Sequence, residues 1–201
     1  MEIFSNISKI RPQKPSTWRG KIFLTFDMDW AHDEIILDTL KILNLYSVKS
    51  TWFITNKSSV IELLRGDKNI ELGIHPNFNP LLENKGKNQN YNDIISNLIE
   101  IIPEAKSIRS HSMTQNSKIL DAFFSNGITH DVNHFIPNFD NQILKPWRHW
   151  NGLIKVPYLW EDDVHILYKK INILESEPYD IIQTKKNNGL KVFDFHPIQI
   201  F

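Results

Sequence analysis

The chain has 201 residues, of which 41% are hydrophobic and 11% aromatic; this is enough to bury one sizeable core and gives no sign of a second. Lys and Arg together number 23, as do Asp and Glu, so no net charge attracts nucleic acid or an anionic membrane. Cysteine is absent, which excludes disulfides, thiolate metal sites and cysteine nucleophiles, and leaves His, Asp and Glu as the strong metal ligands. These numbers favour a single domain that recognises a neutral or small polar ligand.

Residues 1–20 are interrupted by charged residues and prolines, so they contain no continuous apolar core of signal-peptide length. No later apolar run approaches the length that spans a membrane. We therefore expect a polar N-terminal leader over residues 1–20, one folded domain over residues 21–201, and a cytoplasmic protein without a membrane span. The sequence predicts no nucleic-acid partner and leaves the oligomeric state open.

Strand and helix patterns alternate along the chain. Residues 21–26 form a short apolar run typical of a buried strand, and residues 34–45 place apolar side chains on one helical face, with Asp33 as the expected N-cap. The alternation predicts further strands at 50–55, 69–74, up to Arg109, 128–129, 153–158 and 191–195, and further helices at 58–65, 92–102 and 117–125. About seven strands with helices between most of them are typical of a mostly parallel α/β sheet, either doubly wound or closed into a barrel.

Polar residues gather where the predicted strands end. In chain order they are Asp27, Asp29, His75, Arg109, His111, Asp131, Glu161, Asp162, Asp163 and His196. The loops at the carboxyl ends of parallel strands form the active-site face of α/β folds. We therefore expect these side chains to converge.

The first of these clusters contains two carboxylates, Asp27 and Asp29, one residue apart at a strand end. One can bind a metal ion while the other stays free as a base. The alternative is a pair of solvated acids near a helix start, although Asp33 is better placed than either to cap that helix. A catalytic role explains the pair better than a structural one.

The remaining clusters supply histidines and an arginine. Imidazole is a frequent zinc ligand, so His75 is a candidate, but a lone histidine is more often structural. Arg109 could fix an ionised Asp27 and His111 could bind a metal, or both could pair with surface acids. His196 is suited to proton transfer near neutral pH, or it merely packs near the C-terminus.

Together these residues resemble the motifs of the polysaccharide deacetylase (NodB-homology) family, over about residues 21 to 200. Residues 25–29 (TFDMD) resemble the first motif, in a form with one residue between the two acids. The second motif normally has two metal-binding histidines four residues apart; His75 matches the first, whereas Asn79 stands at the second position. The later motifs have counterparts in chain order at residues 109–111, 157–163 and 196–197.

The resemblance implies a single-domain, incomplete (β/α)7-type barrel and a hydrolase that removes an N-acetyl or similar acyl group from a sugar. It implies one divalent metal ion, with zinc expected, and an N-acetylated sugar or glycan precursor as the partner. The motifs also resemble a short branch of the family associated with bacterial surface-polysaccharide gene clusters. The implied roles are general base for Asp27, oriented by Arg109; general acid for His196; metal ligands for Asp29, His75 and, in place of the missing histidine, His111; and substrate contact for Trp30, Asn79, Trp160 and Asp162.

Two other functions compete with this interpretation. Residues 26–29 also resemble the signature of a haloacid-dehalogenase-type phosphatase with Asp27 as nucleophile, but that signature should continue with Gly and Thr, and it gives the three histidines no task. A catalytically inactive relative that only binds a glycan would explain the loss of a histidine at Asn79. Acetate release, phosphate release and metal binding distinguish the three functions.

Overall fold

The computed structural model describes residues 3–83, 90–137, 143–170 and 188–200. The described residues form one nine-stranded sheet with the strand order β6-β7-β5-β4-β3-β2-β1-β9-β8. All neighbouring strands in it are parallel except β6 and β7. The strands are β1 (Ile22–Asp27), β2 (Ser50–Ile54), β3 (Ile70–Ile74), β4 (Ser107–Ile108), β5 (His130–Phe135), β6 (Trp147–Arg148), β7 (Ile154–Tyr158), β8 (Trp160–Glu161) and β9 (Lys191–Phe195).

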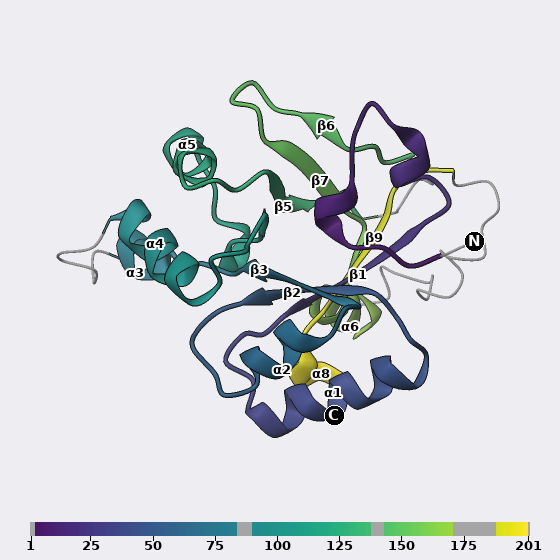
Figure 1. The fold of residues 1–201 in the computed structure, drawn as a ribbon. Helices are drawn as coiled ribbons and strands as arrows, with labels where there is room; N and C mark the ends of the chain where they lie inside the picture. Colours follow the sequence, from purple (N-terminus) through teal and green to yellow (C-terminus); the bar gives the residue numbers. More distant parts are fainter. Residues whose placement is uncertain (1–2, 84–89, 138–142, 171–187, 201) are drawn as a thin grey trace.

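The sheet curls into a half-barrel (Figure 1). Strand β7 contacts β9, although β5, β4, β3, β2 and β1 lie between them in the sheet order. The prediction of a single-domain α/β fold with an incomplete, mostly parallel barrel is therefore confirmed, with more strands than the seven expected.

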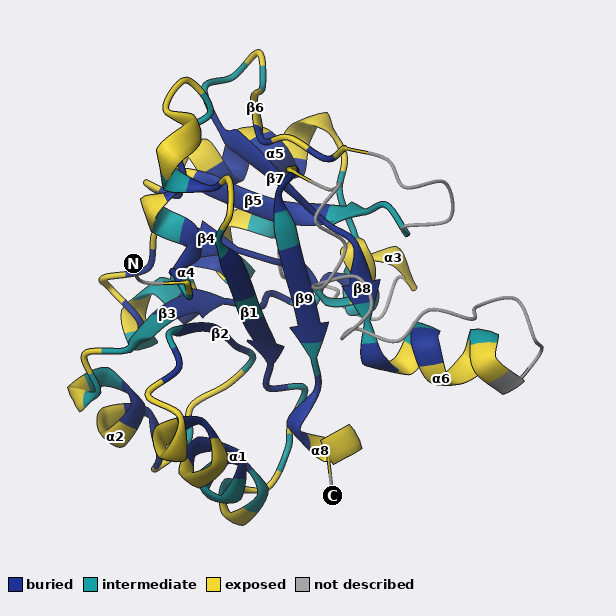
Figure 2. Cartoon of the chain, turned by 90° about the vertical axis from the view of Figure 1, so that its right-hand side faces the viewer, coloured by how far each residue is buried: buried dark blue, intermediate teal, exposed yellow. Residues whose placement is uncertain are grey.

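Helices cover the outer face of the half-barrel, with α1 and α2 beside β1 to β3 and α4 and α5 beside β3 to β5 (Figure 1). Their exposed faces point away from the buried strands (Figure 2). The helices are α1 (Asp33–Leu45), α2 (Ile61–Gly66), α3 (Asn79–Leu82), α4 (Tyr91–Ile101), α5 (Ser117–Ser125), α6 (Asp162–Lys170) and α8 (Pro197–Ile200), with 3-10 turns η1 (Ile7–Lys9), η2 (Pro15–Thr17) and η3 (His111–Met113). None of the helices in these described ranges is long and apolar enough to cross a membrane.

The apolar residues form two clusters, one on each face of the sheet. The outer cluster contains Phe26 and Trp52 with the buried faces of α1, α2, α4 and α5. The inner cluster contains Phe23, Phe53 and Val156. Because side chains alternate between the two faces of a strand, β1 directs Phe23 inward and Phe26 outward. Thr25 and Asp27 follow the inward register, which brings polar groups into the interior near the carboxyl end of β1.

The N-terminal segment packs into the amino end of the half-barrel. Ile7 and Ile10 are fully buried in the inner cluster. The Asn6 side chain donates a hydrogen bond of 2.8 Å to the carbonyl of Ser50, and the Ile7 amide donates one of 3.1 Å to Oγ1 of Thr51. The segment that the sequence predicted to be a polar leader thus contributes two apolar side chains, Ile7 and Ile10, to the interior.

Two sequence predictions about local structure are wrong. Asp33 does not cap α1: His32 holds the N-cap position, and the Asp33 carboxylate accepts hydrogen bonds from the hydroxyls of Ser58 and Ser59. The strand expected at residues 128–129 instead begins at His130 and runs to Phe135 as β5. Asp131 therefore lies inside a strand and not after one.

Candidate active site

Two carboxylates lie where β1 ends: Asp27 is the last residue of the strand, and Asp29 begins a strained turn. Asp29 and Trp30 both have positive φ values, of 39° and 58°, which non-glycine residues adopt only at an energetic cost. The turn is held by the Asp29 amide, which donates to Oγ1 of Thr55 at 3.1 Å, and by the Met28 amide, which donates to the carbonyl of Phe53 at 3.1 Å. With this turn, Asp27 is buried and the carboxylate of Asp29 contacts His75 and His111.

Three side chains from three loops place their donor atoms together. Oδ1 of Asp29 lies 3.0 Å from Nε2 of His75 and 3.1 Å from Nδ1 of His111, and the two ring nitrogens are 3.4 Å apart. His75 directly follows β3, and His111 begins the turn η3 after β4. Ser112, next to His111, has a positive φ of 55°, so a second strained turn helps to position the third side chain.

This triangle suits a tetrahedral zinc-like ion. Ligand bonds of about 2.0–2.1 Å in a tetrahedron place neighbouring donor atoms about 3.3 Å apart, close to the three observed separations. Two imidazoles and one carboxylate are also donors that zinc accepts in catalytic sites. Burial alone would raise the pKa of Asp29, but the hydrogen bonds with His111 and His75 lower it well below its usual range, so the carboxylate is ionised. The residues present therefore fit one divalent metal ion.

Arg109 holds a buried pair of acids beneath this triangle. Its NH1 donates to Oδ1 of Asp27 at 2.9 Å and also to Oδ1 of Asp194. Its guanidinium lies between the rings of Phe53 and Tyr158, with centroid distances of 4.8 and 4.5 Å. The side chain is only 1% exposed, so water does not compete for these bonds. Arg109 thereby fixes one oxygen of Asp27, and the other oxygen lies 3.5 Å from Nδ1 of His75.

His196 lies next to the metal triangle. Its Nδ1 pairs with Oδ1 of Asp162 at 2.7 Å, its backbone amide donates to Oδ2 of the same carboxylate at 2.7 Å, and its Nε2 lies 3.4 Å from Oδ2 of Asp29. Burial would lower the pKa of His196, but the hydrogen bond with Asp162 and the charges of Asp194 and Asp27 outweigh it and raise the pKa to about 10. The ring is therefore protonated at neutral pH.

A small cavity of about 110 Å³ lies between these groups. It is lined by Asp27, Asp29, His75, Arg109, Ser110, His111, Ser112, Met113, Tyr158, Glu161, Asp163 and His196. All six side chains that the sequence predicted as catalytic or metal-binding line this one cavity. They come from strands that lie side by side in the sheet, from β4 through β1 to β9, so the carboxyl edge of the sheet brings them together.

The residues predicted to contact substrate divide into two groups. Trp30 is 51% exposed and its ring contacts the ring of His111 at 5.1 Å, so it lies beside the cavity. Asn79 donates to the hydroxyl of Ser112 at 3.4 Å and lies at the rim. Asp162 and Trp160 do not line the cavity: Asp162 is buried behind His196, and Trp160 packs against Phe195. We correct these two assignments to a positioning residue and a core residue.

Asp131, which was expected at the site, also lies elsewhere. It is fully buried, forms an ion pair with Lys155 and accepts the side-chain amide of Asn133 at 2.6 Å. Oδ1 of Asn133 in turn accepts the amide of Ser110 at 2.8 Å. This network supports the loop before His111 from behind and does not reach the cavity.

Sequence reasoning assigned no role to three residues of the site. Asp194 shares Arg109 with Asp27, Thr25 accepts from NH2 of Arg109 at 2.9 Å, and the Tyr158 hydroxyl donates to Glu161 at 3.1 Å. The inward register of β1 could have indicated Thr25, which lies two residues before Asp27 on the same face. The Asp194 contact depends on the pairing of β1 with β9 and has no local signature.

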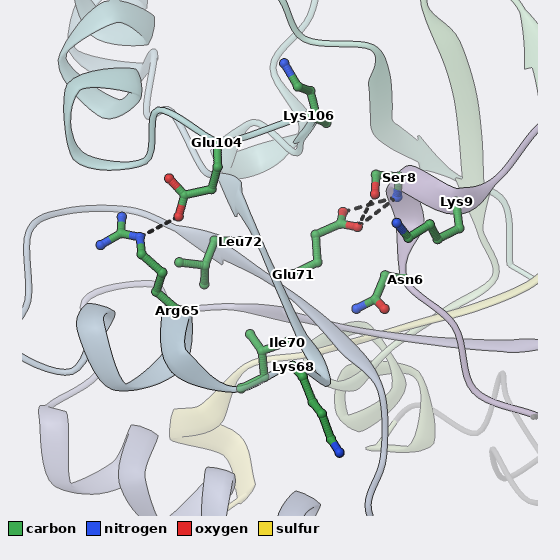
Figure 3. Close-up of a pocket in the computed structure, with 10 residues that line it drawn as sticks. All are labelled: Asn6, Ser8, Lys9, Arg65, Lys68, Ile70, Glu71, Leu72, Glu104 and Lys106. Atoms are coloured by element: carbon green, nitrogen blue, oxygen red, sulfur yellow. Dashed lines mark hydrogen bonds and ion pairs between the residues drawn. The ribbon is translucent and has the colours of Figure 1, made fainter.

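A larger cavity of about 290 Å³ opens at the amino end of β3 (Figure 3). Its central acid, Glu71, is tied to Ser8 and Ser107 by hydrogen bonds, and Arg65 is paired with Glu104 at 2.6 Å. In Figure 3 the amines of Lys68 and Lys106 point away from Glu71. Its two acids are thus already bonded to neighbouring protein groups, and two of its lysines diverge, unlike the charged groups of the smaller cavity.

Comparison with known proteins agrees with the fold and identifies the family. The family model described as WbmS-like polysaccharide deacetylase matches residues 24–201, so the chain belongs to this family. A crystal structure from Bordetella bronchiseptica, provisionally described as a polysaccharide deacetylase involved in O-antigen biosynthesis, is 38% identical with a TM-score of 0.87. That match covers 99% of this chain and 80% of the other.

More distant structures share less of the chain. A 4-alpha-glucanotransferase from Thermococcus litoralis is 11% identical with a TM-score of 0.53, over 98% of this chain and 34% of that one, which shows a shared fold alone. A CE4 family pseudoenzyme from Bacillus anthracis is 17% identical with a TM-score of 0.49, over 93% of this chain and 56% of the other. No protein of curated function matches the chain significantly.

Proposed function

We propose that the chain is a metal-dependent hydrolase that removes an N-acetyl or similar acyl group from a sugar in bacterial surface-polysaccharide metabolism. The observation that carries this proposal is the triangle of Asp29, His75 and His111 next to an oriented carboxylate, Asp27, and a protonated imidazole, His196. Membership of the polysaccharide deacetylase family supports the reaction class, and the Bordetella relative supports the metabolic setting. A cytoplasmic location stays a prediction.

One divalent ion, which we propose to be zinc, would be held by Asp29, His75 and His111. Such an ion polarises an amide carbonyl and lowers the pKa of a bound water from 15.7 to about 7. Asn79, at the position where the family usually has a second histidine, makes no contact with the triangle among the described residues. His111 supplies the third donor instead, from the loop after β4.

Asp27 is placed to act as general base. Arg109 holds its Oδ1, and its other oxygen faces the ring of His75, so the carboxylate can take a proton from a water without changing its rotamer. A positioned general base of this kind contributes about 10²- to 10⁴-fold to a rate. Arg109 also forms ion pairs with both Asp27 and Asp194, and its positive charge stabilises these two buried acids.

His196 is placed to act as general acid. Its Nε2 faces the cavity, and Asp162 holds its Nδ1, which fixes the ring orientation and favours the protonated form. A departing amine must gain a proton to leave, and His196 carries one at neutral pH. A carboxylate oxygen of Asp27 and a ring nitrogen of His196 lie within 4.8 Å of each other, so the base and the acid both adjoin the proposed metal.

The alternatives receive less support. Membership of the polysaccharide deacetylase family does not favour the phosphatase, which also leaves the three histidines unused. An inactive glycan-binding relative would need no oriented base, no charged acid and no third donor. Asp27, His196 and His111 provide all three.

The direct test is acetate release from a panel of N-acetylated sugars, free, nucleotide-linked and polymeric, by protein carrying one equivalent of zinc. We expect acetate release that stops when the metal is chelated. In Asp27→Asn the protein should keep its metal but lose about 10²- to 10⁴-fold in kcat/KM. Bound metal and bound glycan without any acetate would contradict the proposal in favour of the inactive relative, and phosphate release from small phosphoesters would favour the phosphatase.

A further inference from the structure

The cavity has a second wall that the proposed mechanism does not use. Tyr158 ends β7, Glu161 ends β8, and Asp163 lies in the first turn of α6. Carboxylate oxygens of Glu161 and Asp163 lie within 4.8 Å of a ring nitrogen of His196, and both residues line the same cavity as His75 and His111. A substrate whose acyl group reaches the metal triangle must therefore pass its sugar close to these two acids.

Glu161 has one oxygen available to a ligand. The Tyr158 hydroxyl donates to its Oε2 at 3.1 Å, and within the described ranges no hydrogen bond reaches its Oε1. Tyr158 is fully buried and packs on Arg109, so it holds Glu161 in one orientation. The side chain is thus fixed on one oxygen and open to the cavity on the other.

The wall carries two acids, and the cation nearest to them is the ring of His196. Among the described residues, neither Glu161 nor Asp163 forms an ion pair with a lysine or an arginine. Burial and the charge of Asp163 raise the pKa of Glu161 to about 7, and they outweigh the opposing charges of Arg109 and His196. Asp27, in contrast, forms an ion pair with Arg109.

We infer that Glu161, supported by Asp163, is a specificity-determining residue that selects sugars presenting hydroxyl or amino groups next to the acylated nitrogen and excludes those with a carboxylate or phosphate there. This inference rests on the proposed function. An open carboxylate oxygen accepts hydrogen bonds from hydroxyls and from ammonium groups, and it repels anions. The same wall attracts the amino group that deacylation produces, so the substrate class is a neutral or cationic amino sugar.

The test uses probes that do not require the natural sugar. Hydroxamates chelate an active-site metal, and three of nearly equal length differ in the charge of their tails: β-alanine hydroxamate is cationic, butyrohydroxamate neutral and succinic monohydroxamate anionic. Their dissociation constants are measured by calorimetry on the zinc-loaded full chain at about pH 8, where Glu161 is mostly ionised. We expect the cationic probe to bind about 10-fold tighter than the neutral one, and the anionic probe about 10-fold weaker.

Substitutions assign the effect to the wall. Glu161→Gln keeps an oxygen for the Tyr158 hydroxyl while removing the charge, and Asp163→Asn tests the supporting acid separately. Each should reduce the spread between cationic and anionic probes, Glu161→Gln by about 10-fold and Asp163→Asn by less. Glu100→Gln, an exposed residue of α4, makes the same change in net charge away from the cavity and should leave the spread unchanged.

The outcomes separate the two proposals because metal content is measured on the same samples. Bound zinc with equal affinity for all three probes, or a spread that survives in Glu161→Gln, overturns the specificity inference alone. Bound zinc without binding of any hydroxamate overturns it as well, because the wall would then not face a ligand. Failure to bind zinc overturns the proposed function and this inference with it.

Discussion

Two arginines at opposite ends of the sheet each bridge two acids, yet they belong to different kinds of region. Arg109 joins Asp27 and Asp194 at the carboxyl end and is 1% exposed. Arg65 joins Glu62 and Glu104 beside the larger cavity, and its side chain is 30% exposed. The pairing chemistry is the same, so burial and surroundings decide what each arginine does.

The difference shows why the smaller cavity is the site. Arg109 and its two acids are buried, so each charge is stabilised by an oppositely charged partner and not by water. The bond from Arg109 to Oδ1 of Asp27 leaves the other oxygen of Asp27 beside His75. Around Arg65, water shares the charges and nothing converges on a ligand position. Cavity volume alone does not identify the site, because cavities of about 290, 520 and 600 Å³ lie elsewhere on the molecule, whereas the convergence of fixed polar groups does.

The largest expected effect comes from breaking the buried bridge. Arg109→Met leaves two carboxylates buried without a cation, so we expect the free energy of unfolding to fall by about 3–5 kcal/mol and hydrolysis to be lost. Urea unfolding and acetate release measure the two effects. Arg109→Lys, which keeps the charge but not the planar geometry, should recover part of the stability. A loss below about 1 kcal/mol in Arg109→Met would mean that the bridge is not buried as described.

An intermediate effect is expected from Asp162, which acts only through His196. Asp162→Asn keeps one of the two acceptor oxygens that hold His196 but removes the charge that helps to raise the pKa of His196 to about 10. A general acid works below its pKa, so lowering that pKa moves the alkaline fall of kcat/KM to lower pH. We expect the alkaline limb to shift by about one pH unit, with little change near pH 6.

The pH profile also distinguishes positioning from general damage. A purely structural role of Asp162 would lower kcat/KM by the same factor at every pH. An unchanged alkaline limb would contradict the role of Asp162 in holding the proton on His196. His196→Gln, which removes the acid itself, should abolish that limb.

The smallest expected effect is at the exposed bridge. Arg65→Met removes two pairs that are open to solvent, so the free energy of unfolding should change by less than about 1 kcal/mol. Acetate release should stay within about 2-fold of the unmodified chain, since Arg65 has no contact with the site. A loss of activity comparable to that in Arg109→Met would show that the amino-end cavity takes part in the reaction.

The parts of the fold that could be predicted from the sequence are the strands whose apolar pattern is continuous. β1, β2 and β3 were expected within one or two residues of their observed bounds. β5 was misplaced because its buried residues include His130, Asp131 and Asn133, so its core-facing pattern is polar. Strands of two residues, such as β6 and β8, carry no recognisable pattern.

The candidate site was more predictable than its surroundings. Residues at strand ends are brought together by the sheet itself, which is why all six predicted catalytic and metal-binding side chains line one cavity. Whether a side chain faces the cavity or lies behind it depends on tertiary packing. Trp160 and Asp131 were therefore indistinguishable in sequence from residues that face the site, and Asp194 could be recognised only through the pairing of β9 with β1.

The measurement that tests the central claim most directly is the metal content of the purified protein, determined by elemental analysis without chelator or nickel affinity. The account predicts about one equivalent of zinc or a similar divalent ion, lost in Asp29→Ala, His75→Ala and His111→Ala but retained in Asn79→Ala. The same loss in all three ligand variants would establish His111 as the replacement for the missing family histidine. Full metal content in His111→Ala would contradict that ligand set, and absence of metal even after zinc is supplied would contradict the hydrolytic site as a whole.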